Sequence, residues 1–315
     1  MALGSLSPWF DPTHVQAVRD TFPEWMALVF AALSYFGSVY FVAPAVVLTY
    51  WFVDRRRFAP WIAVVAGGYA VMAGVKALLD VPRADVGPAV APDALPLLLQ
   101  IPYSTQVHVT DASFPSGHAL AATVVWTMLA LELNVGTRRQ RLMGAGLMIG
   151  LVALSRVGNG LHYPTDVAGG VALGLVYVAA MLALLSWTNR KRTTLFEPRS
   201  IRETPSPTTA VFAVVAVLAV GALTVTGETT EAGLVGIALG GLVGWNFPDP
   251  RWPSLRRSVG YGFLSILGVT AFFLVSSVAY VVPFAVGLVT ATFVVALPNL
   301  LETTSGPLSM RISRE

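Results

Sequence analysis

The chain contains no cysteine among its 315 residues, so it can form neither a disulfide nor a thiolate metal site. Only four histidines occur, and no HExxH pattern or paired acidic cluster accompanies them. Charged residues make up 12% of the chain, against about a quarter in a typical soluble domain. The sequence therefore predicts neither a soluble globular protein nor a bound metal or other cofactor.

Long apolar runs are abundant instead, since 55% of the residues are hydrophobic. A helix crosses a bilayer with about 20 apolar residues. The candidate runs lie near 25–53, 60–81, 116–134, 141–156, 164–187, 208–227, 231–247, 258–281 and 283–300. Phe36, Gly37 and Pro44 interrupt the first run, so an interfacial piece before Gly37 followed by a span is an equal alternative. We expect an all-α polytopic membrane bundle of about nine transmembrane helices.

Clusters of arginine follow every second expected span and indicate the orientation. They are Arg55, Arg56 and Arg57, then Arg138, Arg139 and Arg141, then Arg190, Arg192, Arg199 and Arg202, and finally Arg251, Arg256 and Arg257. Alternating spans place these loops on one face, which the positive-inside rule makes cytoplasmic. The net charge of +3 therefore reflects topology, and we expect no nucleic-acid partner. Residues 1–24 have no apolar stretch behind a basic front, so we expect no cleaved signal peptide.

A charged, proline-containing stretch divides the chain after residue 187. We expect a membrane core domain over 1–187, a cytoplasmic linker over 188–207, and a C-terminal four-helix membrane domain of unknown role over 208–315. In the last part, Gly236, Gly240 and Gly244 recur at every fourth position, which permits close helix contact. Packing within the chain is the favoured interpretation, and a dimer through these glycines is the alternative.

Eight residues in three separate motifs, seven of them polar and one a glycine, share one expected location. They are Lys76 and Arg83 in KALLDVPR, Ser116, Gly117 and His118 in PSGH, and Arg156, His162 and Asp166 in SRVGNGLHYPTD. The expected topology places the ends of the second and fourth spans, and the starts of the third and fifth, on the external face. Residues up to ninety positions apart are thus expected at one membrane depth. An intramembrane cation such as Lys76 costs several kcal/mol unless it is paired, so it indicates function.

Each motif alone has an ordinary structural explanation. PSGH and HYPTD can be helix starts, and an SR pair can anchor a helix at the interface. Together they supply two histidines, one carboxylate and three fixed cations. Phosphoryl transfer without a metal requires such a set, because the transferred group carries negative charge on its equatorial oxygens. The combination favours a phosphate site.

The three motifs resemble those of the type 2 phosphatidic acid phosphatase family, whose pattern is K-x6-R-P, P-S-G-H and S-R-x5-H-x3-D. The chain keeps every spacing and departs only at Ala84, where the family has proline after the arginine. The resemblance covers about 60–185 and implies a phosphatase core in the N-terminal part of the bundle. It also implies that this core works without a metal.

The resemblance further implies a role for each motif residue. His162 is expected to attack phosphorus and form a phosphohistidine, with Asp166 holding its tautomer. His118 is expected to protonate the leaving group and then to activate water. The phosphate oxygens are expected to be bound by Lys76, Arg83, Ser116, Gly117 and Arg156.

The expected function is that of an integral membrane phosphatase acting at the external leaflet of the cell membrane. Its expected substrate is a polyprenyl or dolichyl diphosphate or a related lipid phosphate. A phosphatidate- or phosphatidylglycerophosphate-type phosphatase and a lipid phosphotransferase are alternatives on the same site. A transporter or scaffold is the non-enzymatic alternative, disfavoured because the polar groups collect at one external edge and not near the midplane.

The external loop over 84–114 contains the apolar stretch LPLLLQI, which is too short to span a bilayer. A piece lying in the interface would suit a substrate with its tail in lipid and its head in water. We expect an entrance or lid here, with a structured loop of no ligand role as an equal alternative.

Overall fold

The computed structural model describes residues 8–194, 206–246 and 280–304, and every regular element in these ranges is helical. The first part contains η2 (Pro8–Phe10), α1 (Pro12–Thr21), α2 (Met26–Ser34), η3 (Tyr35–Gly37), α3 (Val39–Phe52), α4 (Arg55–Leu79), η4 (Pro92–Ala94), α5 (Leu97–Val107), α6 (Gly117–Glu132), α7 (Arg138–Gly158) and α8 (Pro164–Thr194). The second contains α10 (Pro207–Thr226) and α11 (Thr229–Asn246), and the third contains α13 (Val281–Thr304).

Five helical segments in the described ranges are long and apolar enough to cross a membrane. They are Met26–Phe52, Arg55–Leu79, Arg138–Gly158, Pro164–Arg190 and Pro207–Thr226. Two shorter apolar segments, Gly117–Glu132 and Val281–Leu297, match further expected spans. The all-helical membrane architecture is therefore confirmed, while the count of nine is not reached among the described residues. The expected span over 258–281 lies outside them, apart from its last two residues.

The first expected span is interrupted. After α2 and η3, Ser38 adopts an extended conformation with φ −89° and ψ 161°, and α3 starts afresh at Val39. The helix is therefore interrupted at Ser38, just after Gly37, although Met26–Phe52 as a whole is long and apolar enough to cross a membrane. Gly37 also lies close to α6, since a Cβ atom at this position would be 2.5 Å from the backbone oxygen of His118.

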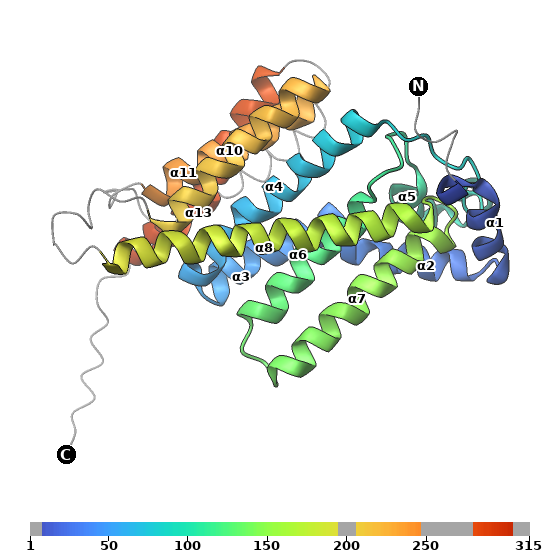
Figure 1. Ribbon diagram of the computed structural model, residues 1–315, viewed down its shortest axis with the longest axis horizontal. Helices are drawn as coiled ribbons and strands as arrows, with labels where there is room; N and C mark the ends of the chain where they lie inside the picture. Colours follow the sequence, from blue (N-terminus) through green and yellow to red (C-terminus); the bar gives the residue numbers. More distant parts are fainter. Residues whose placement is uncertain (1–7, 195–205, 247–279, 305–315) are drawn as a thin grey trace.

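Helix α4 packs against α3, α6, α10 and α11, and α10, α11 and α13 lie together along one side of the bundle (Figure 1). One hydrophobic core contains Trp61 of α4, Met128 of α6 and Phe212 of α10. Hydrogen bonds also join the parts, since the Tyr50 hydroxyl donates to the backbone oxygen of Val295 at 2.6 Å. The described C-terminal helices and the N-terminal helices therefore share one core.

The glycine stripe of α11 packs against α13 within the chain. Cβ atoms at Gly236 and Gly240 would each lie 2.2 Å from a backbone oxygen of α13. One at Gly244 would lie 2.7 Å from the backbone oxygen of Thr292. This is the packing that small residues allow. Because α13 covers these glycines, a dimer through them would require α13 to move away.

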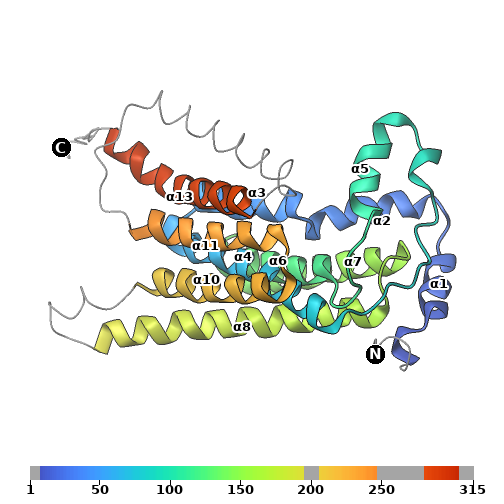
Figure 2. The ribbon, with the colours of Figure 1, turned by 90° about the horizontal axis from the view of Figure 1, so that it is seen from above.

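The two ends of the bundle differ in composition. At one end, the Trp61 indole donates to the Glu132 carboxylate at 3.1 Å and the Arg57 guanidinium donates to the Glu132 backbone oxygen at 3.4 Å. The arginine-rich start of α4 therefore lies beside the end of α6. The opposite ends of these two helices carry Lys76 and His118. Figure 2 shows α1 and α5 at this second end of the molecule.

Candidate active site

Lys76 and Arg83 flank the end of α4. Lys76 lies in its last turn, and Asp80 ends the helix in a left-handed conformation with φ 42°. The Lys76 ammonium lies 2.7 Å from one carboxylate oxygen of Asp111, and Nη2 of Arg83 lies 2.6 Å from the other. Arg83 Nε also donates to the Asp111 backbone oxygen at 2.8 Å. The two cations therefore share one carboxylate partner.

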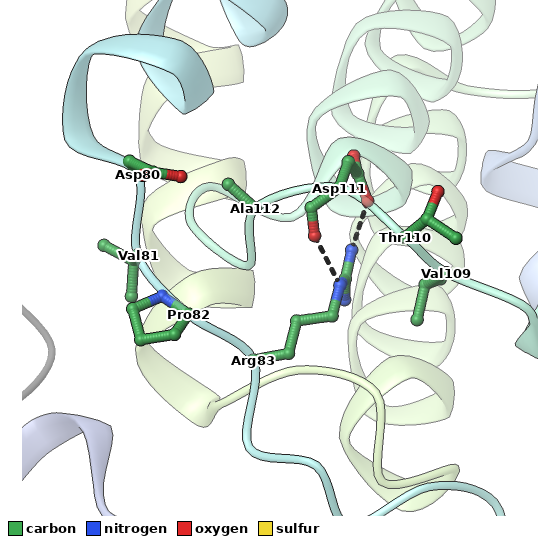
Figure 3. A pocket seen from close by; sticks show the side chains of 8 residues that line it. All are labelled: Asp80, Val81, Pro82, Arg83, Val109, Thr110, Asp111 and Ala112. Carbon is green, nitrogen blue, oxygen red and sulfur yellow. Dashed lines mark hydrogen bonds and ion pairs between the residues drawn. The ribbon is translucent and has the colours of Figure 1, made fainter.

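A pocket of about 400 Å³ opens between the segment 80–83 and the segment 109–112 (Figure 3). The Arg83 side chain points toward Asp111, and the dashed lines mark their contacts. The backbone N–H of Ser113 donates to the backbone oxygen of Val81 at 2.8 Å, which ties the two segments together. The pocket thus gives access to Arg83 and Asp111 from outside the helices.

His162 lies in the short loop between α7 and α8, and Asp166 lies in the first turn of α8. The Nδ1 atom of His162 lies 3.1 Å from Oδ2 of Asp166. The same oxygen accepts from the backbone N–H of Tyr163 at 2.8 Å and from the Ser113 hydroxyl. A carboxylate only accepts, so the His162 proton is placed on Nδ1. The unprotonated Nε2 then lies 3.4 Å from Nη1 of Arg83.

The His162 ring is 2% exposed. Burial lowers the pKa of this ring well below its ordinary value, and the charges of Arg83, Arg156 and Lys76 lower it further. The ring is therefore neutral near pH 7. A neutral imidazole with one nitrogen held by a carboxylate and the other unprotonated is the form that can attack phosphorus.

Arg156 is fully buried in the last turn of α7. Its Nη1 donates to the Gln106 backbone oxygen at 2.7 Å and to the Ser34 hydroxyl at 3.3 Å. Its Nε and Nη2 atoms have no hydrogen-bond partner in the described part of the chain. Unused donors on a buried cation are costly, and an anion with several oxygens satisfies them.

The PSGH segment opens α6. Ser116 is the N-cap residue, and its buried hydroxyl has no partner among the residues that the structure describes. Gly117 lies so close to α4 that a Cβ atom would be 2.4 Å from Met72 Sδ. The Nε2 atom of His118 lies 3.3 Å from Oε1 of Gln106. A helix start with free donors is a natural position for phosphate oxygens.

The structure places all eight residues at the same end of the bundle, at the ends of α4 and α7 and the starts of α6 and α8. Sequence reasoning missed four residues that contact them, namely Ser34, Gln106, Asp111 and Ser113. Asp111 offered one signal, as a carboxylate shortly before PSGH in a loop expected beside two cations. Ser34 and Gln106 offered none, because their partners lie far along the chain.

Residues 88–191 match the family model of the PAP2 superfamily. This region is therefore similar to the PAP2 superfamily. The resemblance inferred from the motifs is therefore confirmed. Lys76 and Arg83 lie just before the matched range, and the helices from α10 onward lie after it.

Two curated relatives carry phosphatase names. Phosphatidylglycerophosphatase B of Bacillus subtilis (strain 168) is 28% identical over 160 residues, which are 48% of this chain and 71% of the relative. Decaprenylphosphoryl-5-phosphoribose phosphatase of Mycobacterium tuberculosis is 36% identical over 125 residues, which are 38% of this chain and 58% of the relative. No solved structure matches the chain significantly. The PAP2 match and these relatives support a phosphatase, that is, a hydrolase activity.

Proposed function

We propose that this PAP2 chain hydrolyses the terminal phosphate of a membrane lipid phosphate or diphosphate, without a metal, through a phosphohistidine at His162. One observation carries the proposal. His162 is held at Nδ1 by Asp166, while its Nε2 lies beside the Arg83 guanidinium that would bind the phosphoryl group. A nucleophile and an oxyanion-binding cation thus lie next to one another.

In the first half of the reaction, Nε2 of His162 attacks phosphorus in line and forms a P–N bond. The P–O bond to the lipid breaks, and His118 gives its proton to the leaving oxygen. Three cations, Lys76, Arg83 and Arg156, stabilise the charge on the equatorial oxygens in the transition state. The products of this half are the phosphohistidine and the lipid alcohol or lipid monophosphate.

In the second half, water attacks the phosphohistidine and His118 takes a proton from it. The P–N bond breaks, inorganic phosphate leaves, and His162 returns to its neutral form. The free donors of Arg156 and the Ser116 hydroxyl are available to the phosphate oxygens in both halves.

The proposed substrate is a lipid with a terminal phosphate, with a polyprenyl or dolichyl diphosphate first and phosphatidate or phosphatidylglycerophosphate next. Both relatives support this class by name. One name describes a decaprenyl lipid bearing a 5-phosphoribose, and the other a phosphatidylglycerol phosphate. A terminal phosphate on a lipid is the property that the two names share.

The proposed active-site face is the external face of the cell membrane. The arginine-rich start of α4 lies at the end of the bundle opposite the site, together with the end of α6. Because basic loops favour the cytoplasm, this arrangement supports an external site. Lipid carriers that finish their work outside would meet the enzyme there.

The test is phosphate release by the purified protein in EDTA, with prenyl diphosphate, phosphatidate and a soluble phosphomonoester offered in parallel. His162→Ala should abolish both phosphate release and any acid-labile phosphoenzyme. His118→Ala should slow turnover by about 10²-fold or more, yet still form phosphoenzyme from a substrate whose leaving group needs no proton. His14→Ala, on exposed α1, is the matched control and should behave as the unsubstituted protein.

Phosphoenzyme formation by His162→Ala would contradict the assignment of the nucleophile. A requirement for added magnesium would contradict the metal-free scheme. Loss of the terminal phosphate from the lipid only when an alcohol is supplied, with the phosphoryl group recovered on that alcohol and not as free phosphate, would identify a phosphotransferase.

A further inference from the structure

The Asp111 carboxylate forms ion pairs with two of the three cations that the proposed function assigns to the phosphoryl group. One oxygen lies 2.7 Å from Lys76 Nζ and the other 2.6 Å from Arg83 Nη2. The Asp111 side chain is 56% exposed, whereas those of Lys76 and Arg83 are 8% and 16% exposed. The carboxylate therefore reaches the buried cations from the open side of the pocket, as Figure 3 shows for Arg83.

The segment that carries Asp111 is held in place by its backbone. The Asp111 backbone oxygen accepts from Arg83 Nε at 2.8 Å, and the Ala112 backbone oxygen accepts from the Lys76 ammonium. The following N–H, of Ser113, donates to Val81. These contacts leave the carboxylate as the part that can rotate away while the segment stays bound.

The Asp111 carboxylate is ionised at neutral pH. Burial alone would raise its pKa, but the charges of Lys76 and Arg83 outweigh burial and hold the pKa below its usual value. One full negative charge therefore already neutralises part of the positive charge at this position. Any anion that binds Lys76 and Arg83 must compete with it.

We propose that Asp111 is a specificity-determining residue, whose carboxylate admits only groups with more negative charge than its own to Lys76 and Arg83. The inference rests on the proposed function and deepens it. A terminal phosphomonoester carries a charge of about −1.5 to −2 at pH 7. A phosphodiester, as in the headgroups of ordinary bilayer lipids, carries a single charge.

The charge difference explains the selection. Replacing the carboxylate by a phosphodiester exchanges one negative charge for another, so the electrostatic attraction at the two cations changes little. Replacing it by a phosphomonoester adds negative charge beside Lys76, Arg83 and the unpartnered donors of Arg156. Phosphodiester headgroups are concentrated at a membrane surface, so a site for terminal phosphates benefits from such built-in competition.

A purely structural role for Asp111 predicts the opposite effect of substitution. If the carboxylate only holds Lys76 and Arg83 in position, its removal should make both side chains less ordered and weaken the binding of every anion. If it competes with the ligand, its removal should strengthen anion binding. The affinity for singly charged anions should then increase most. The sign of the change therefore separates the two roles.

The experiment compares Asp111→Asn with the unsubstituted full-length protein in detergent and EDTA. Binding of inorganic phosphate and of dimethyl phosphate is measured by calorimetry and by inhibition of hydrolysis. Asp111→Asn should bind dimethyl phosphate at least about tenfold more tightly, and the preference for phosphate over dimethyl phosphate should fall. Asp111→Glu keeps the charge and should keep the preference.

Asp93→Asn is the matched control, because it removes the same charge from an exposed position of the same loop. It should leave both affinities unchanged. Equal or weaker dimethyl phosphate binding in Asp111→Asn, with hydrolysis still dependent on His162, would overturn this inference alone. Absence of phosphate binding in every variant, together with absence of hydrolysis, would overturn the proposed function as well.

Discussion

At the scale of the residue, His162 is a neutral ring surrounded by positive charge. Burial and the charges of Arg83 and Arg156 lower its pKa well below 6.5. If the neutral ring is the nucleophile, as proposed, activity should persist below the pH at which an ordinary histidine is protonated. The same shift affects stability. Below about pH 6.5 the unfolded chain binds a proton that folded His162 does not. The free energy of unfolding therefore decreases as the pH is lowered.

The first prediction concerns the acid limb of the pH profile of kcat/KM. Arg83→Gln removes the cation 3.4 Å from His162 Nε2, so the pKa of His162 should rise and the acid limb should move to higher pH. The maximum kcat/KM should also fall, but the pH of the acid limb is the quantity that tests the assignment. Arg57→Gln removes the same charge at the far end of α4 and should leave the limb in place. Coincident limbs in the two variants would contradict the assignment of His162.

The second prediction concerns Gln106, which sequence reasoning did not identify. Its Oε1 accepts from His118 Nε2, whereas its backbone oxygen holds Arg156. Gln106→Leu should therefore lower kcat about tenfold for a lipid alcohol leaving group, and much less for an acidic phenol that needs no proton. Gln100→Leu, in the same helix, is the control. An equal loss with both leaving groups would show that Gln106 does not position the acid.

The eight motif residues could be predicted together because each lies at a helix end, and topology decides the depth of helix ends. The contacts of Gln106 and Asp111 could not be predicted from the sequence. They depend on how the segment between α4 and α6 folds, and hydropathy does not determine the path of a loop. The Ser113 contact with Asp166 joins residues 53 positions apart and has no local signal.

At the scale of the element, apolar runs predicted the helices and capping residues explain their ends. Thr137 starts α7 with a capping box formed with Gln140, and Gly227 ends α10 in a left-handed conformation with φ 65°. The break after Gly37 was one of two alternatives, because an apolar run continues across it. The structure also brings Gly37 close to the His118 backbone, a tertiary contact that hydropathy cannot show.

The apolar stretch in the 84–114 loop is helix α5, and its two sides differ. Leu98 is 88% exposed and Ile101 is 71% exposed, whereas Tyr103 and Gln106 on the same helix are buried. Such a helix at the site end of a membrane protein suits the interface, with its apolar side in the acyl region. The buried side carries Gln106, which contacts His118 and Arg156.

The third prediction tests this helix. The double substitution Leu98→Asn and Ile101→Asn should raise KM for a lipid phosphate in vesicles by about tenfold, since apolar area that would enter the interface is lost. Hydrolysis of a soluble phosphomonoester by the same variant should change less than about twofold, because the buried side is intact. Equal losses on both substrates would place the effect in the site and not in membrane contact.

At the scale of the whole molecule, the charge asymmetry between the two ends leads to the fourth prediction. The chain has no cysteine, so single cysteines report sidedness without background. Cysteine at exposed Ala94, beside the site, should react with an impermeant thiol reagent in intact cells. Cysteine at exposed Val135, between α6 and α7, should react only after the membrane is opened. The reverse pattern would invert the topology and the proposed leaflet.

The division of the chain near 188–207 was predicted from composition. A charged segment marks a surface loop, but it does not reveal what the helices on either side pack against. In the folded protein, Ala70 of α4 lies in one buried cluster with Ala219 and Ala222 of α10. The division into a core domain, a linker and a C-terminal domain stays a prediction, while the shared core could be found only from the structure.

The contact between α4 and α10 has a consequence for biosynthesis. Every residue of the proposed site has been synthesised by position 166, well before α10 leaves the ribosome. Yet the helix that carries Lys76 acquires one of its main neighbours only when α10 enters the membrane. Until then, the α4 face around Ala70 lacks the α10 residues that cover it in the folded protein. Maturation of the enzyme therefore depends on the arrival of a helix that contributes none of the eight motif residues.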